Sequence, residues 1–124
     1  MPISIEVDEE RRILIATATG EVAFAGVRGF IHTVRSGERR AWKLIFDMTG
    51  ATSDITSEHI RSLAVDVGSA LQNEGLRAPV ALVADSNALF GVMRMYQILC
   101  EQQGVGTIHV FRTRQEAEAW LLSL

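Results

Sequence analysis

The sequence is poor in cysteine, proline and aromatic residues, and the shortage of cysteine excludes a fold held together by internal disulfides. Of 124 residues, one is cysteine and two are proline, and aromatic residues make up 6%. A single cysteine cannot form an internal disulfide, and it suits a reducing compartment. We interpret Cys100, which lies in an apolar helical stretch, as a buried and unreactive thiol. The composition therefore predicts a cytoplasmic protein.

Long hydrophobic runs and an excess of basic charge are missing as well. No apolar stretch reaches the ~18 residues that a membrane span requires, and the opening "MPISIEVDEE" lacks the features of a signal peptide. Twelve Lys and Arg stand against 15 Asp and Glu, for a net charge of −3. Without a basic stripe, binding to nucleic acid or to an anionic membrane is not favoured. We predict neither a nucleic-acid partner nor membrane insertion.

The sequence does contain enough apolar residues for one core. Apolar residues make up 48% and charged residues 22%, which is typical of a globular chain, and we predict one domain over 1–124. Residues 3–7 alternate between apolar and polar, the polar turn "DEERR" occupies 8–12, and an apolar run follows at 13–19. This pattern predicts an antiparallel hairpin whose first strand has one wet face and one buried face.

After Gly20 the period becomes helical and then alternates regularly between helices and buried strands. Helices are expected from about 22 to the loop at 36–40, and over 57–74, 86–103 and 113–124; strands are expected at 43–48, 79–84 and 107–112. We expect Gly75 to cap the second helix, and Gly26 and Gly29 to allow close packing in the first. The order predicts an α/β fold with four helices. Its five-stranded sheet would be mostly parallel, with the N-terminal hairpin strand antiparallel at one edge.

With this order, the chain resembles the SpoIIAA-like family, whose best-known members are the STAS domains, the anti-sigma-factor antagonists. Two stretches carry the resemblance: "LIFDMTGATSDITSEHI" at 44–60, and "ALFGVMRMYQIL" followed by "IHVFRTRQEAEAWL". The chain looks closest to the small stand-alone bacterial branch described as STAS/SEC14-like. The resemblance implies strands in nearly sequential order, and a function in binding rather than catalysis.

STAS antagonists carry a serine at a helix start that a partner kinase phosphorylates. Asp47 and Thr49 match the first part of their motif, and Thr56 and Ser57 fall where its serine pair would be. The match then fails, because Glu58 and His59 replace the Gly-Leu of the motif and Ile55 replaces the aspartate before its serines. Glu58 would also oppose the added negative charge of a phosphate. The alternative interpretation, which we favour, is that Thr56 caps the helix while Ser53 and Asp54 bond the backbone of their own turn.

Catalysis is not favoured by the remaining motifs. The three histidines lie in three different elements without metal-ligand spacing, and no cofactor motif is present, so we expect no metal and no cofactor. The strand order permits Asp47, Thr49 and His59 to meet at the carboxyl edge of the sheet, where α/β proteins bind ligands. We predict instead that Asp47 orients the following turn, as an ionised carboxylate that accepts backbone N–H groups. The chain is therefore expected not to be an enzyme.

The helix at 86–103 places apolar residues on its outward face. At 100° per residue, one broad face holds Ala88, Leu89, Val92, Met93, Tyr96, Leu99 and Cys100. Phe90, Arg94 and Ile98 form a stripe on the opposite face, which predicts a contact surface for a homodimer or a hydrophobic partner. The alternative is that Phe90 folds beneath a neighbouring loop.

Two functions from different classes stay open. The first is a non-catalytic interaction module that resembles an anti-sigma-factor antagonist and binds a protein partner or a second copy through 47–60 and the third helix. The second, implied by the SEC14-like side of the resemblance, is a small carrier of an apolar ligand or lipid. A carrier needs a cavity of several hundred Å³, for which a chain with complete core stripes has little room.

Overall fold

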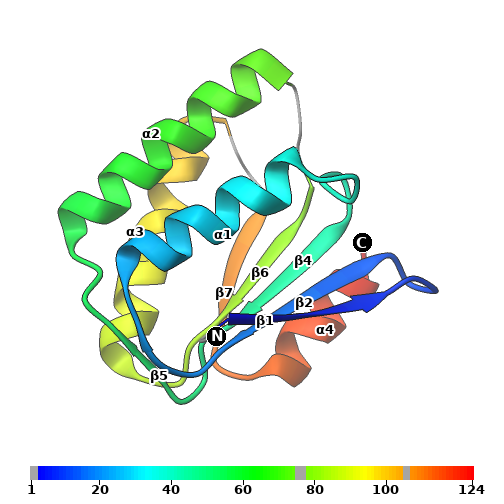
Figure 1. Ribbon diagram of the computed structural model, residues 1–124, viewed down its shortest axis with the longest axis horizontal. Coiled ribbons are helices and arrows are strands. Elements are labelled where there is room, and N and C mark those ends of the chain that lie inside the picture. The colour runs from blue at the N-terminus through cyan, green and yellow to red at the C-terminus, as the bar shows by residue number, and fades with distance from the viewer. Residues whose placement is uncertain (1–2, 75–77, 105–106) are drawn as a thin grey trace.

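The predicted five-stranded sheet is present in the computed structural model, which describes residues 3–74, 78–104 and 107–124 (Figure 1). Its strands are β1 (Ile3–Asp8), β2 (Ile13–Ala18), β4 (Lys43–Asp47), β6 (Val80–Val83) and β7 (Ile108–Phe111), in the spatial order β1-β2-β4-β6-β7. β1 pairs antiparallel with β2, and all other neighbours pair parallel. The predicted fold class is thereby confirmed, including the antiparallel hairpin strand at one edge.

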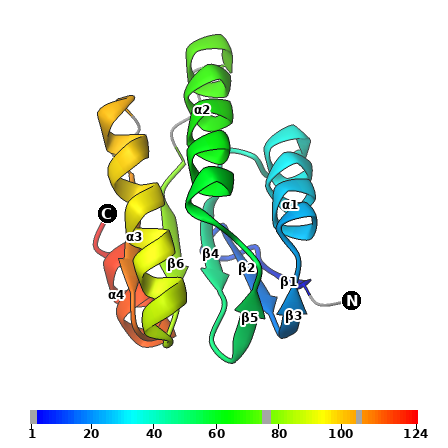
Figure 2. The same ribbon diagram turned by 90° about the vertical axis from the view of Figure 1, so that its left-hand side faces the viewer.

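Four helices cover the two faces of this sheet: α1 (Phe24–Ser36), α2 (Ser57–Glu74), α3 (Asn87–Gln102) and α4 (Arg114–Leu122). Figure 2 shows α1, α2 and α3 side by side on one face, with α1 at the end of the sheet that holds β1 and β2. α4 packs on the other face, where Ala117 and Leu121 are buried against Ile45 and Val83. The regular crossovers make this arrangement the expected one for alternating strands and helices.

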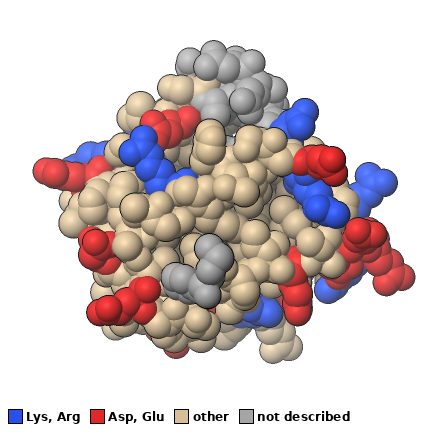
Figure 3. Space-filling model, viewed as in Figure 1, with Lys and Arg blue, Asp and Glu red and all other residues tan. Residues whose placement is uncertain are grey.

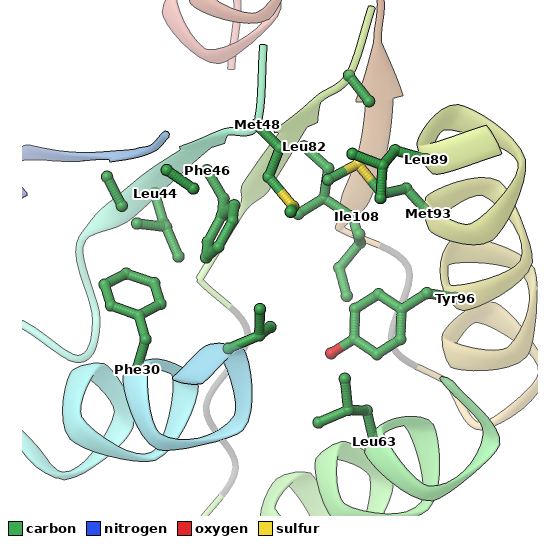
Figure 4. Close-up of a cluster of buried hydrophobic side chains, with 14 of the residues drawn as sticks. Phe30, Leu44, Phe46, Met48, Leu63, Leu82, Leu89, Met93, Tyr96 and Ile108 are labelled. Atoms are coloured by element: carbon green, nitrogen blue, oxygen red, sulfur yellow. The ribbon is translucent and has the colours of Figure 1, made fainter. Parts of the chain in front are cut away.

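The main core lies between the sheet and the three-helix layer. Figure 4 shows the ring of Tyr96 from α3 between Leu63 of α2 and Ile108 of β7. Phe30 of α1 meets Phe46 of β4 edge to face, with ring centroids 5.1 Å apart. These contacts join the helices to the strands and to one another. The apolar faces of the helices predicted from the sequence therefore pack into one hydrophobic cluster.

Two short strands were not predicted. β3 (Gly20–Val22) and β5 (Ala51–Ser53) pair parallel in a separate two-stranded sheet. We expected Gly20 only to end a strand, and the segment after Asp47 to be a plain turn. Gly20 and Gly50 have positive φ angles of 68° and 78°, which glycine adopts without steric cost. They turn the chain so that the two segments meet.

The prediction that β1 has one wet and one buried face is confirmed only at Ile3, which is half-buried against the main core. The other apolar residues of β1 lie opposite β2 residues of the main core, Ile5 facing Ala16 and Val7 facing Leu14. Nevertheless Ile5 is 49% exposed and Val7 is 42% exposed. β1 is the edge strand and its outer side has no neighbouring strand, so the helix layer covers this face only in part.

The glycine interpretation also needs correction. A Cβ atom added at Gly26 or Gly29 would meet no neighbouring atom within 4 Å, so these glycines do not serve close packing. The glycine that does so is Gly68 in α2, which lies against the side chain of Gln103. The predicted cap at Gly75 lies outside the described residues.

Candidate functional site

The candidate site begins at Asp47, where β4 ends at the carboxyl edge of the sheet. The side chain is buried, with 6% of the residue exposed. Its Oδ1 accepts the backbone N–H of Thr49 at 2.8 Å, which is the turn-orienting hydrogen bond that we expected. Its Oδ2 accepts Nε of Arg114 at 2.9 Å, and Nη2 of Arg114 donates to Thr17 Oγ1 at 2.8 Å. The carboxylate thus ties β4 to its own turn and to α4.

These contacts fix the charge of Asp47. Burial is the largest single influence and raises the pKa of the carboxyl group. The hydrogen bonds from the hydroxyl and backbone of Thr49, together with the hydrogen bond and positive charge of Arg114, outweigh it and lower the pKa below the usual value of 3.8. Asp47 is therefore ionised at neutral pH and has its oxygens occupied, which suits a structural anion better than a general base.

The segment 48–59 continues from this point over the surface toward α2. β5 pairs with β3 in the middle of the segment, and Ser53 Oγ donates to the carbonyl of Val22 at 2.6 Å. Asp54 Oδ1 accepts the backbone N–H of Phe24, the first residue of α1, at 2.9 Å. The prediction that Ser53 and Asp54 bond their own turn is wrong: Ser53 bonds β3 and Asp54 bonds the first residue of α1, and the pairing of β3 with β5 brings these segments together.

The start of α2 is capped as predicted. Thr56 Oγ1 accepts the backbone N–H of His59 at 3.2 Å, and His59 Nδ1 accepts the backbone N–H of Thr56 at 3.1 Å. The ring of His59 also stacks on Phe24, with centroids 4.0 Å apart and planes 4° from parallel. Ser57 is exposed beside Glu58, an acidic residue in the first helical turn.

His59 consequently does not join Asp47 and Thr49. The three residues that the strand order permits to meet are divided between two clusters. Asp47 and Thr49 belong to the carboxyl edge with Arg114, whereas His59 belongs with Thr56 and Phe24 at the paired starts of α1 and α2. Across residues 3–74, 78–104 and 107–124, no three His, Cys, Asp or Glu side chains are grouped so as to hold a metal ion.

The turns that follow β4, β6 and β7 are joined to one another. Asp85 Oδ1 accepts the backbone N–H of Gly50 at 3.4 Å, and the carbonyl of Asp85 accepts Nη1 of Arg112 at 3.3 Å. The same nitrogen of Arg112 donates to Asn87 Oδ1 at 3.0 Å. These bonds hold the loops at the carboxyl edge in one arrangement.

The predicted outward stripe of α3 is only partly outward. Phe90 is half-buried against the core, and the guanidinium of Arg112 lies 3.9 Å from the centre of its ring. Arg94 donates to Gln97 Oε1 at 3.3 Å, and Gln97 in turn donates to Glu101 at 3.0 Å, all within α3. Arg94 and Ile98 are exposed as expected, Ile98 at 44%, which leaves Ile98 as the exposed apolar residue of the stripe. Ala88 is exposed as well, although the helical spacing places it on the inward face.

Arg112 and Arg114 are the two site residues that sequence reasoning missed. Both follow a strand end, next to the capping threonine Thr113, whose hydroxyl accepts the N–H of Glu116 at 3.2 Å. Their position in the sequence could have indicated them. A basic residue just after the last strand lies at the same edge of the sheet as Asp47, because the carboxyl ends of parallel strands share one edge.

Comparison with known proteins bears on the fold. No family model matches the chain, and no curated protein does. Among solved structures, it is similar to an uncharacterized protein of the DUF3478 family from Shewanella loihica PV-4, described as having a SpoIIAA-like fold. The TM-score is 0.54 over 96% of this chain and 91% of that one, at 15% sequence identity. The fold is SpoIIAA-like. At this identity the likeness extends to architecture and not to activity.

Within the described part of the chain, no helix combines the length and the apolar character needed to cross a bilayer.

Proposed function

We propose that this SpoIIAA-like domain is a non-catalytic module that binds a protein partner through the segment 48–59 and the adjoining starts of α1 and α2. The observation that carries the proposal is that this segment is exposed at several positions, yet is held by contacts from elsewhere in the chain. Residues Thr49, Gly50, Thr52, Asp54, Thr56, Ser57 and Glu58 are exposed.

Three kinds of contact hold the segment. The β3–β5 ladder pairs its backbone, Asp54 caps α1, and His59 both bonds Thr56 and stacks on Phe24. A partner that binds a segment already held in place loses less conformational entropy than one that must order a loop. This supports a recognition surface rather than a plain connection.

The surface beside the segment suits a protein partner. Figure 3 shows charged side chains mostly around the rim of this face, with uncharged residues over its centre. α1, which lies on this face in Figure 1, has small exposed residues, among them Ala25, Gly26 and Gly29. Surfaces depleted of charge at their centre and polar at their rim are typical of protein interfaces.

A catalytic role finds less support. Asp47 is ionised, and both of its carboxylate oxygens accept structural hydrogen bonds, Oδ1 from Thr49 and Oδ2 from Arg114, which favours a structural anion over a general base. His59 is engaged through Nδ1 in capping α2. Both ionisable groups that sequence reasoning considered for chemistry are accounted for by structural roles.

The test compares partner capture by matched surface variants. Thr52→Arg and Ser57→Arg each place a long charged side chain on the proposed surface, whereas Gln115→Arg adds the same side chain to an exposed position of α4, across the sheet. Purified wild type and the three variants would be used as baits in native cytoplasm at equal concentration. Circular dichroism would establish that each is folded.

We expect the wild type and Gln115→Arg to retain the same protein at similar yield, and Thr52→Arg and Ser57→Arg to lose at least about tenfold, equivalent to about 1.4 kcal/mol. Equal retention by all four baits would contradict the proposed surface. Turnover of a small molecule by the purified wild type, abolished by Asp47→Asn, would contradict the non-catalytic assignment.

A further inference from the structure

The proposed binding surface does not account for the exposed apolar residues of β1. Ile5 and Val7 stand 49% and 42% exposed on the same side of the sheet as α1. β1 is an edge strand, and its outer backbone groups have no partner strand among the described residues. Unpaired N–H and C=O groups beside apolar side chains form a template for another strand.

β1 has few of the devices that protect sheet edges. Between Ile3 and Asp8 there is neither proline nor lysine, and the pairing with β2 runs through six residues without a bulge. Its charged residues are Glu6, which alternation places on the face opposite Ile5, and Asp8 at its end, which pairs with Arg11. The opposite edge differs: β7 is four residues long, and each of its side chains is buried or half-buried. Natural proteins usually blunt a free edge with charge, proline, bulges or cover, so an edge with two exposed apolar residues and a single mid-strand carboxylate points to pairing.

We infer that β1 is a homodimer interface, in which two copies of the chain pair β1 antiparallel about a two-fold axis through Ile5. The two five-stranded sheets then form one continuous ten-stranded sheet. This inference is independent of the proposed function, because the 48–59 segment is not part of β1. A two-fold interface closes on itself and leaves no further edge of the same kind.

The sequence of β1 selects the register. With the axis at Ile5, each Ile5 faces its copy, Ile3 faces Val7, and Ser4 faces Glu6. All apolar side chains then share one face, and no carboxylate lies directly opposite another. Moving the axis to Glu6 would place the two Glu6 side chains opposite each other, and moving it to Val7 would place Glu6 opposite Asp8. Like charges directly opposite one another are destabilising.

A second copy is the occupant that this complementarity favours. The strand is complementary to itself, both in its apolar pairs and in the Ser4 hydroxyl that faces the Glu6 carboxylate. The paired length is short, because the backbone of residues 3–7 buries less than the ~1,200 Å² of a standard stable interface. We therefore expect a dimer that dissociates on dilution, at micromolar concentrations.

This interface differs from the α3 stripe predicted from the sequence, and Ile98 provides a matched control. Ile98 is 44% exposed, close to the exposure of Ile5, but it lies on α3. Sedimentation velocity would be measured from about 5 to 500 µM on wild type, Ile5→Lys and Ile98→Lys. Circular dichroism would follow folding, and Ile5→Thr, which keeps a β-branched side chain in the strand, would replace Ile5→Lys if the latter were unfolded.

We expect the wild type and Ile98→Lys to sediment as dimers at the upper concentrations, and the Ile5 variant to remain a folded monomer. A wild type that is monomeric throughout would overturn the inference. The inference would also be overturned if the Ile5 variant still formed dimers while Ile98→Lys was monomeric, since that result would place the interface on α3.

A cysteine pair tests the register itself. The native Cys100 is buried, so one introduced surface thiol can be followed alone. Directly opposite residues of paired strands have Cβ atoms about 4.5–5.5 Å apart, close to disulfide distance. The two copies of Val7, by contrast, would lie about 13 Å apart along the strands. Mild oxidation should cross-link Ile5→Cys into a covalent dimer and leave Val7→Cys monomeric. Equal cross-linking of both variants would refute the pairing about Ile5.

Discussion

Asp47 is a buried, charged residue at the end of β4. It is one of two buried polar residues among those described, the other being Gln97, and its carboxylate connects the turn after β4 with Arg114. A buried carboxylate that lost these partners would be costly, whereas one that keeps them defines how β4, its turn and α4 fit together. Its role at the residue scale is structural.

Replacing Asp47 by asparagine should lower the free energy of unfolding by about 2 kcal/mol, because hydrogen bonds to a charged partner contribute about that much. The measurement is urea unfolding at pH 7. Asp54→Asn is the control: Asp54 is exposed and caps α1 through one oxygen, which asparagine also provides, so its stability should change little. Equal losses in the two variants would contradict this account of Asp47.

The effect of Asp47 should depend on pH in a defined direction. Because its pKa in the folded protein lies below the usual 3.8, the ionised carboxylate contributes stability that is fully present above about pH 5. That contribution is lost as the pH falls through the pKa of Asp47 in the unfolded chain toward its lower pKa in the folded protein. The stability difference between wild type and Asp47→Asn should therefore narrow between pH 6 and about pH 3. A constant difference would show that the ionised form is not the stabilising one.

Thr56 and Ser57 are expected to remain unmodified. Thr56 Oγ1 already accepts the N–H of His59 as the cap of α2, and a phosphate on either hydroxyl would meet the negative charge of Glu58. After incubation with an extract of the native cell and ATP, intact-mass analysis should show only the unmodified chain. A species heavier by about 80 Da, mapping to Thr56 or Ser57, would instead place the protein among phosphorylated switches.

At the scale of elements, α1 carries an avoidable cost. Gly29 lies within the helix, and a Cβ atom there would meet no neighbouring atom within 4 Å. Gly29→Ala should raise the free energy of unfolding by about 1 kcal/mol, the difference in helix propensity. Gly68→Ala in α2 is the comparison, because the added Cβ would displace Gln103, whose Nε2 donates to the carbonyl of Ala64 at 2.7 Å.

The lost hydrogen bond at Gln103 should offset the helix gain at Gly68, for no net stabilisation. Urea unfolding of both variants tests the pair, and Gln103→Ala supplies the background in which Gly68→Ala should recover its gain of about 1 kcal/mol. If Gly68→Ala stabilised the wild type as much as Gly29→Ala does, the contact between α2 and Gln103 would have no energetic role.

The longer elements were predictable because their apolar period recurs over many residues. α2 spans Ser57–Glu74, the range that the sequence predicts, and β4 lies within its predicted range. β3 and β5 were not predictable, since three residues are too few for a period and their pairing joins segments about thirty residues apart. The same limit explains Ser53 and Asp54, whose partners lie near α1.

The exposure of the α3 stripe differs from the prediction for a related reason. An angle of 100° per residue places Phe90 outward, but it contains no information on which neighbours extend over the helix. Arg112, from the end of β7, covers Phe90, and no local pattern links the two residues. The homodimer prediction through α3 is left with Ile98 as its exposed apolar residue, while the edge strand presents two.

At the scale of the whole molecule, the two proposed contact surfaces lie at different edges of the sheet. The carboxyl ends of β4, β6 and β7 meet in loops joined through Asp85 and Arg112, and the segment 48–59 extends from this edge to the starts of α1 and α2. The exposed side of β1 lies at the lateral edge of the sheet. A module with two separate surfaces can bind a partner at one while pairing with its own copy at the other.

The apolar-carrier alternative is tested best on the whole molecule. Leu63, Tyr96 and Ile108 point toward one another between the helix layer and the sheet (Figure 4), and each is less than 10% exposed. Side chains thus occupy the position between α2 and α3 where a ligand would have to lie. We expect the purified wild type to show only the mass of the bare chain in native mass spectrometry, and its thermal midpoint to stay unchanged in benzene-saturated buffer.

Leu63→Ala is the control that shows the assay can detect a cavity. Truncating a buried leucine costs about 3–5 kcal/mol and leaves an apolar void, and a void of this kind stays dry and binds benzene. Benzene should therefore raise the thermal midpoint of Leu63→Ala and leave that of the wild type unchanged. An apolar molecule retained by the wild type, or an equal benzene shift in both proteins, would show that the native core has room for a ligand and would favour the carrier over the interaction module.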